Sequence, residues 1–138
     1  MKTILFLLLL LPAVCFSQKS LDTKIIVSVS DPTGLYEKVR ISFVNNEFIV
    51  KDNRNPDTLT TYAREVKPIG YVLAQAVISG NKVTLSGILS TRKINMLGYT
   101  VMPGPADYKK IYYYKRDKAW LTLANVAAAI KGEITYSK

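Results

Sequence analysis

The sequence predicts an α+β domain, built mainly from an antiparallel sheet of about seven strands with one or two short helices. Three observations carry this prediction. Residues 70–90 form two apolar runs around a two-residue turn, residues 118–131 show a single polar helical face, and short alternating segments fill much of the remaining chain. An all-β sandwich or small barrel is the alternative, because short apolar segments also fit strands.

The first residues have the pattern of a secretory signal peptide. Lys2 gives a basic start, residues 4–11 form an unbroken apolar run, and Pro12 precedes a region suited to cleavage. The run is shorter than the roughly 20 apolar residues of a transmembrane helix. We therefore expect a signal peptide at residues 1–17, a single β-rich domain at residues 18–138, and an exported protein that is periplasmic or secreted.

The chain has one cysteine, Cys15, near the expected cleavage site. A minor alternative is a lipoprotein anchored at Cys15, although Val14 fits poorly in front of a lipid-modified cysteine. Cleavage after Ser17 leaves a mature chain without cysteine. Such a domain must be stabilised by its hydrophobic core and not by disulfides.

The first half of the domain is expected to combine strands with one helix. Residues 24–30 alternate apolar and polar side chains, which predicts a half-buried strand, and residues 31–34 predict a turn. A hairpin is expected around residues 45–46, with Phe43 facing Phe48.

A short helix is expected next, capped by Asp57 and ended by Pro68. Its apolar side chains fall at i, i+3, i+4 and i+7: Leu59, Tyr62, Ala63 and Val66.

The segment at residues 70–90 predicts a long hairpin together with its register. With Gly80-Asn81 as the loop, one face is wholly apolar and pairs Ile78 with Val83, Ala76 with Leu85, Ala74 with Gly87 and Val72 with Leu89. The other face is mixed and pairs Val77 with Thr84, Gln75 with Ser86, Leu73 with Ile88 and Tyr71 with Ser90. A slip of one residue would exchange the two faces, so the pattern determines the register.

The remaining chain predicts strands at residues 96–102, 108–115 and 133–137. Between the last two, residues 118–131 fit a helix that Asp117 caps and Gly132 ends. Two strands, at residues 119–123 and 128–136, are the competing interpretation of that segment.

The composition excludes several kinds of chemistry. The chain has no histidine, and its one cysteine lies in the predicted signal peptide, which excludes structural zinc sites and His- or Cys-based triads. The glycines are scattered singly, so no phosphate-binding loop is present. We expect no metal and no cofactor, and nothing in the sequence selects a catalytic pair of carboxylates.

The positive signal is an asymmetry of charge. Residues 19–66 contain seven basic and seven acidic side chains, whereas residues 67–138 contain eleven basic and three acidic ones. Such a field favours association with polyanions.

Within this basic half, residues 108–116 interleave tyrosines with lysines and an arginine. As a strand, the segment would place Tyr112 and Tyr114 on one face with Lys110 and Arg116. Aromatic faces beside cations are typical of surfaces that bind polyanions. The candidate ligand-binding residues are Lys109, Lys110, Tyr112, Tyr114, Lys115, Arg116 and Lys118. The competing interpretation is an edge strand whose lysines prevent aggregation and whose tyrosines pack.

Two function classes follow from these patterns. The first is a small, exported, non-catalytic binding or envelope-associated module that contacts an acidic polysaccharide, lipopolysaccharide, nucleic acid or other polyanion through its C-terminal half. The alternative is a small secreted hydrolase with a carboxylate or Ser/Lys site. Two converging carboxylates, or a buried lysine beside a serine, would favour the hydrolase.

Overall fold

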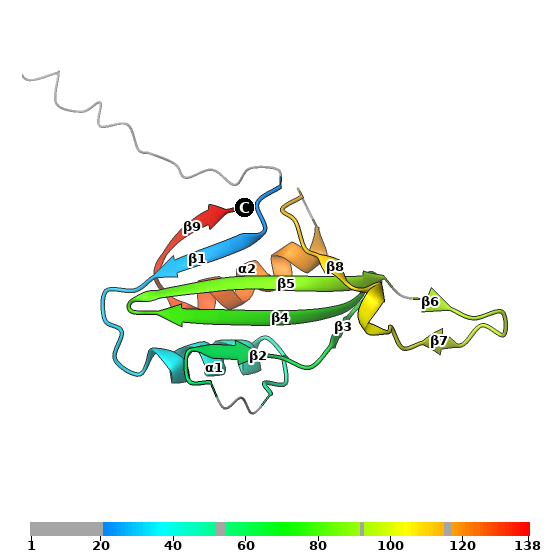
Figure 1. The fold of residues 1–138 in the computed structure, drawn as a ribbon, viewed down its shortest axis with the longest axis horizontal. Helices are drawn as coiled ribbons and strands as arrows, with labels where there is room; N and C mark the ends of the chain where they lie inside the picture. The colour runs from blue at the N-terminus through cyan, green and yellow to red at the C-terminus, as the bar shows by residue number, and fades with distance from the viewer. Residues whose placement is uncertain (1–20, 52–54, 92, 115–116) are drawn as a thin grey trace, which may run out of the picture.

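The computed structural model describes residues 21–51, 55–91, 93–114 and 117–138 (Figure 1). The predicted signal peptide and Cys15 lie outside the described residues. The elements run in the order β1 (Lys24–Ser28), α1 (Leu35–Asn45), β2 (Thr58–Thr60), β3 (Arg64–Val66), β4 (Gly70–Ser79), β5 (Lys82–Thr91), β6 (Lys93–Ile94), β7 (Thr100–Val101), the 3-10 helix η1 (Pro105–Asp107), β8 (Lys109–Lys110), α2 (Lys118–Ile130) and β9 (Glu133–Ser137).

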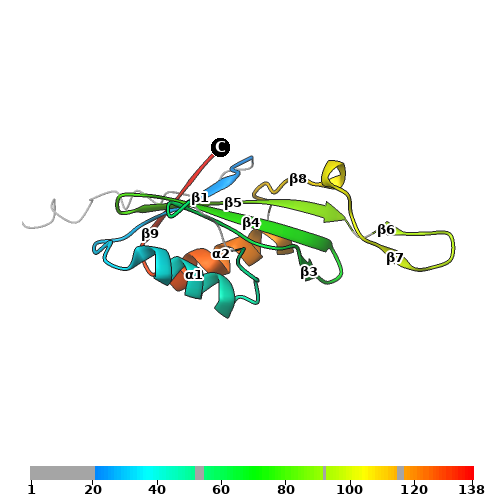
Figure 2. The ribbon, with the colours of Figure 1, turned by 60° about the horizontal axis from the view of Figure 1, so that its bottom comes forward.

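A seven-stranded antiparallel sheet forms one layer, and both helices lie on the same face of it (Figure 2). The strand order is β2-β4-β5-β1-β9, with β3 also paired to β4 and β8 also paired to β5. Strands β6 and β7 form a separate two-stranded sheet. The predicted α+β class, with a mainly antiparallel sheet and two helices, is therefore confirmed. In the part of the chain that the structure describes, no helix is long and apolar enough to span a membrane.

The predicted β4–β5 register is confirmed pair by pair. Strand β4 pairs with β5 from Ser79↔Lys82 to Gly70↔Thr91, and the eight predicted pairs lie between these ends. The apolar face of the hairpin is the one that meets the helices. Val72, Ala76, Val83 and Leu85 are completely buried there.

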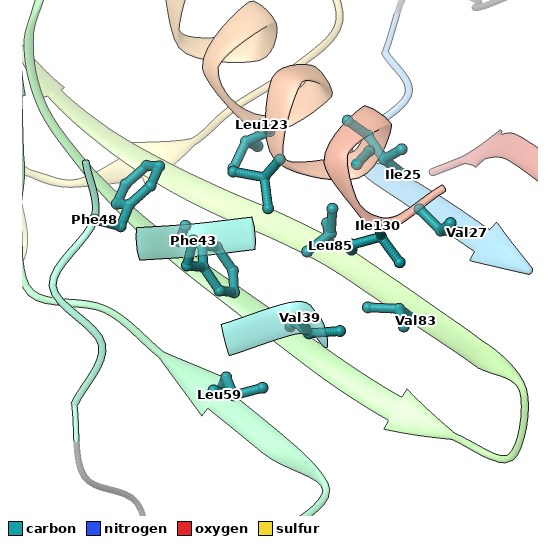
Figure 3. Close-up of a cluster of buried hydrophobic side chains, with 14 of the residues drawn as sticks. Ile25, Val27, Val39, Phe43, Phe48, Leu59, Val83, Leu85, Leu123 and Ile130 are labelled. Carbon is teal, nitrogen blue, oxygen red and sulfur yellow. The ribbon is translucent and has the colours of Figure 1, made fainter. Parts of the chain in front are cut away.

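The core fills the space between this apolar face and the two helices. Helix α1 contributes Val39 and Phe43, and α2 contributes Leu123 and Ile130; these side chains meet the apolar side chains of β1 and β5 (Figure 3). Helix α2 begins as predicted, because the Ala119 N–H donates to the Asp117 carboxylate at 2.8 Å. The left-handed residue that ends it is Lys131, with φ 62°, and not Gly132.

Gly132 has a different role, which is the close approach of the chain to β1. A Cβ atom at this position would lie 2.5 Å from the Ser28 carbonyl oxygen and 2.8 Å from a Val27 methyl carbon. Such contacts are too short for any side chain. Glycine is therefore required where the chain leaves α2 and turns into β9.

The hairpin predicted around residues 45–46 is wrong, because residues 35–45 form helix α1. Leu35, Val39 and Phe43 recur every four residues and all are buried, which places them on one helical stripe. Phe43 and Phe48 do contact each other, with ring centroids 5.7 Å apart, but Phe43 lies on the helix. The alternation that suggested a strand competed with a helical period, and packing against the sheet favoured the helix.

The helix predicted at residues 57–66 is also wrong, because the segment forms β2 and β3 at the edge of the sheet. Of its apolar stripe only Leu59 is fully buried, while Tyr62 and Ala63 are exposed. The side chain of Thr61 accepts the Ala74 N–H at 3.0 Å, which joins the segment to β4 between the two short strands. Pairing with β4 therefore outweighs the local helical spacing.

Two further strands are shorter than predicted. The expected strand at residues 96–102 is reduced to β7, two residues long; residues 96–98 lie in the turn that connects β7 with its partner β6. The expected strand at residues 108–115 is reduced to β8, two residues long, which pairs with Ile88 and Leu89 of β5.

The confirmed register yields a prediction about stability. Leu85 is completely buried, whereas Thr84 points to the opposite, partly exposed face. Leu85→Ala should lower the free energy of unfolding by about 2–5 kcal/mol, the usual cost of a cavity in a core. Thr84→Ala should cost much less, as measured by urea denaturation. Equal costs at the two positions would contradict the register.

A second prediction tests the contact at Gly132. Gly132→Ala should destabilise the protein by about 1–3 kcal/mol, because the added methyl group overpacks against the backbone of β1. Gly104→Ala is the matched control, since a Cβ there meets its nearest neighbour at 3.7 Å, an ordinary contact. Thermal unfolding of both variants measures the difference, and equal melting temperatures would show that the chain at Gly132, after α2, does not approach β1 so closely.

Candidate anion-binding site on the open face of the sheet

The face of the sheet opposite α1 and α2, here called the open face, is covered by neither of these helices, and the short 3-10 helix η1 lies on this side next to β8 (Figure 2). Its side chains alternate along each strand with the buried ones. The central strands β4 and β5 present the mixed face predicted from the sequence, including Gln75 and Ser86. Most of these side chains are partly or fully exposed, so that the surface is available to a ligand.

A polar row crosses the open face and has a lysine at each end. Thr60 pairs with Gln75, and Gln75 pairs with Ser86. The antiparallel pairing of Ile25 with Leu85 places the preceding residue, Lys24, next to Ser86. At the other end, the Lys51 N–H donates to the Thr60 carbonyl at 2.8 Å.

A second row lies beside the first and is mainly apolar. Leu73 pairs with Ile88, and Ile88 pairs with Lys110 of β8. The two rows enclose a hollow of about 420 Å³, whose lining includes Lys24, Lys51 and Lys110. Among the described residues that line this hollow, none is acidic.

Lys24 and Lys110 are neighbours because β1 and β8 occupy the same edge of β5. Lys24 lies beside Ser86 and Lys110 beside Ile88, so the two backbones are roughly 7 Å apart along the strand direction. Lys51 approaches the hollow from the opposite side, where its ammonium lies 5.1 Å from the centre of the Tyr62 ring. The ion pairs that the structure describes involve Arg40, Arg64 and Lys93, and not the lysines of the hollow.

The segment after β8 is held by contacts with the core. Ile111 is buried and its N–H donates to the Gly87 carbonyl at 3.0 Å. Gly87 leaves room for this contact, since a Cβ there would lie 3.0 Å from the Ile111 side chain. Tyr113 packs edge-on against Trp120, with ring centroids 5.6 Å apart. Inward-facing Ile111 and Tyr113 therefore leave Tyr112 exposed on the surface.

The structure separates the candidate residues selected from the sequence. Lys110 lines the hollow, and Lys109 is its exposed neighbour in β8. Tyr112 and Tyr114 are exposed, and Lys118 is the exposed first residue of α2. Lys115 and Arg116 lie outside the described residues.

Two lysines of the hollow were missed by the sequence analysis. Lys24 belongs to the polar positions of the predicted first strand, but its partner strand could not be read from that pattern. The segment that precedes Lys51 was predicted to be a strand of a hairpin, whereas in the structure it follows helix α1. Both reach the hollow through pairings between distant parts of the chain, for which the sequence contains no local signal.

In the described ranges, no cluster of three or more acidic, histidine or cysteine side chains is suited to a metal ion. Lys24 lies beside Ser86 but is exposed, unlike the buried lysines that act as general bases.

No protein-family model, curated protein or solved structure matches this chain.

Proposed function

We propose that this protein is an exported, non-catalytic module that binds an acidic polymer across the open face of its sheet. The observation that carries the proposal is the hollow, where three lysines from separate segments surround polar and apolar side chains without an acidic residue in the described lining. Lysine is a compact, strongly hydrated cation that suits phosphate, sulfate and carboxylate groups. An anion in the hollow would offset the repulsion between Lys24 and Lys110.

The shape of the site favours a polymer over a small ion. From Lys51 to Lys24 the polar row crosses four strand spacings, which corresponds to roughly 19 Å. A single phosphate cannot contact both ends of such a row, whereas a chain with repeated anionic groups can. The apolar row beside it offers Leu73 and Ile88 to the less polar faces of sugars or bases.

The expected location of the protein limits which acidic polymers it can meet. A signal-peptide pattern at residues 1–17 supports export, so that the polymers within reach are acidic polysaccharide, lipopolysaccharide and extracellular nucleic acid. All three carry repeated anionic groups and share the same electrostatic chemistry. The hydrolase alternative has less support, because none of the described residues that line the hollow supplies a carboxylate.

The proposal predicts a change in the salt dependence of binding. With single-stranded DNA as the probe, Lys24→Gln combined with Lys110→Gln should reduce the slope of log K against log salt concentration by about 1.4, since each lost phosphate contact accounts for roughly 0.7. Fluorescence anisotropy at several salt concentrations measures the slope. Elution from a heparin column should move to lower salt in parallel.

A matched control separates this effect from the loss of net charge. Lys38→Gln combined with Lys131→Gln removes the same charge from α1 and from the end of α2, in the layer opposite the open face. This control should leave the slope close to that of the wild-type protein. Identical slopes for the two double variants would rule out the hollow as the binding site.

The exposed tyrosine next to β8 gives a further prediction. Tyr112→Ala should weaken binding to single-stranded DNA without changing the salt slope, because stacking on a base releases no counterions. Tyr62→Ala should also weaken binding, since its ring holds Lys51 at the opposite side of the hollow. If Tyr112→Ala leaves the affinity unchanged, the tyrosines after β8 are not a stacking surface.

A further inference from the structure

A hairpin projects from the end of the sheet and forms no part of the hollow. It consists of β6, β7 and the turn between them, residues 93–102, and is called the arm here (Figures 1 and 2). Its two strands share only the pairs Lys93↔Val101 and Ile94↔Thr100. A two-stranded hairpin of this size is only marginally stable in water by itself.

The arm exposes an unusual concentration of apolar side chains. Met96 is fully exposed, and Leu97 and Tyr99 are 79% and 68% exposed. Val101 and Met102 are exposed as well. From Ile94 to Ala106 the sequence contains no charged residue. Contiguous exposed apolar surface of this kind marks a site of contact with a membrane or another protein.

Four backbone N–H groups at the tip of the arm are paired within the arm. The side-chain oxygen of Asn95 accepts the N–H groups of Leu97 and Tyr99, at 3.0 and 2.9 Å. The Gly98 N–H donates to the Asn95 carbonyl at 3.0 Å, and the Asn95 N–H donates to the Tyr99 carbonyl at 2.9 Å. A tip that enters an apolar medium needs this arrangement, because unpaired backbone groups are costly there.

The base of the arm is basic. Lys93 pairs with Asp107 across the base, and Lys109 follows in β8. The Lys93 ammonium and the Gly104 N–H both donate to Asp107 and hold the pKa of its carboxyl below the ordinary value. Lys67 is exposed in the turn before β4, whose first residue pairs with Thr91, the last residue of β5 before the arm. Glu65, on β3, is an exposed acidic residue at the same end.

We propose that the arm inserts its apolar tip into the surface of an anionic lipid bilayer, with the lysines at its base at the level of the headgroups. Tyrosine is enriched at this level of membranes, where one end of the ring is apolar and the other meets water. Lysines next to an anionic leaflet add electrostatic attraction to the apolar contact. The side chains of Met96 and Leu97 supply the inserted surface.

A bilayer explains the arm better than a second protein chain does. A protein that added a strand to the arm would use free backbone groups, as in strand addition. Four N–H groups of the tip instead donate to acceptors on Asn95 and Tyr99, within the tip itself. An uncharged tip above a basic base also matches the order of layers in an anionic membrane, apolar inside and negative at the surface.

Fluorescence of a tryptophan placed on the arm tests whether the arm enters the bilayer. Trp120 is the only tryptophan in the sequence and is 1% exposed, so that its emission provides a constant background. On adding vesicles of phosphatidylglycerol and phosphatidylcholine, Tyr99→Trp should shift its emission to shorter wavelength and be quenched by brominated acyl chains. Ile49→Trp, at an exposed position between α1 and β2, should show neither change.

Vesicle co-sedimentation tests the apolar contact directly. Met96→Ser combined with Leu97→Ser should lower the partition coefficient by roughly tenfold or more, whereas Ile49→Ser combined with Leu121→Ser, two exposed positions elsewhere, should not. Vesicles of phosphatidylcholine alone should bind the wild-type protein more weakly. Heparin elution of the Met96/Leu97 variant should match the wild type, which separates this proposal from the polymer site.

Three outcomes would overturn the proposal. The first is an emission of Tyr99→Trp that vesicles leave unshifted. The second is an equal loss of vesicle binding in the two serine double variants. The third is a wild-type protein that is dimeric without lipid and becomes monomeric on changing Met96 and Leu97, because a second copy of the chain would then cover the arm.

Discussion

The pairing of β4 with β5 is the constraint on which the rest of the structure depends. The register of this hairpin places its apolar side chains on a single face of the sheet. Both helices pack against that face, because their own apolar side chains are buried there. The remaining strands of the main sheet extend it outward: β2 and β3 join β4, β1 and β8 join β5, and β9 joins β1. The opposite face is left open as a direct consequence. The register of one hairpin thus determines both where the core lies and where a ligand can bind.

The parts of the fold that could be predicted from the sequence are those whose signals are local. The hairpin carries its turn residues and its alternation within residues 70–90, and α2 carries its cap at Asp117. The wrong predictions concern segments whose apolar residues fit both the alternation of a strand and the period of a helix. Phe43 belongs both to an alternating pattern and to a helical stripe, and the helix forms because that stripe covers the sheet. Residues 57–66 were misassigned in the opposite sense, since Leu59 and Thr61 are fixed by pairing with β4 and not by a helix.

The candidate site was predictable only in part, for the same reason. Lys110 could be selected because its neighbours in the sequence are tyrosines and lysines, which form a local composition signal. Lys24 and Lys51 lie more than fifty residues earlier in the chain and reach Lys110 only through β1, β2 and the central hairpin. A charge count along the sequence placed the basic excess in the second half, whereas the hollow draws two of its three lysines from the first half. Proximity in a sheet is a property of the strand order, and composition does not encode it.

The arm and the hollow are linked by strand β5. The chain leaves β5 at Thr91, forms the arm, and returns to the same strand at β8. Lys110 lies opposite Ile88, three residues before Thr91, so the hollow begins about 10 Å from the base of the arm. The arm continues beyond the end of the long hairpin (Figure 1). A bilayer that takes up its tip would therefore hold β4 and β5 upright, with the open face directed sideways just above the headgroups. An acidic polymer attached to that membrane would meet the three lysines there, so the two proposed contacts are compatible in a single orientation of the protein.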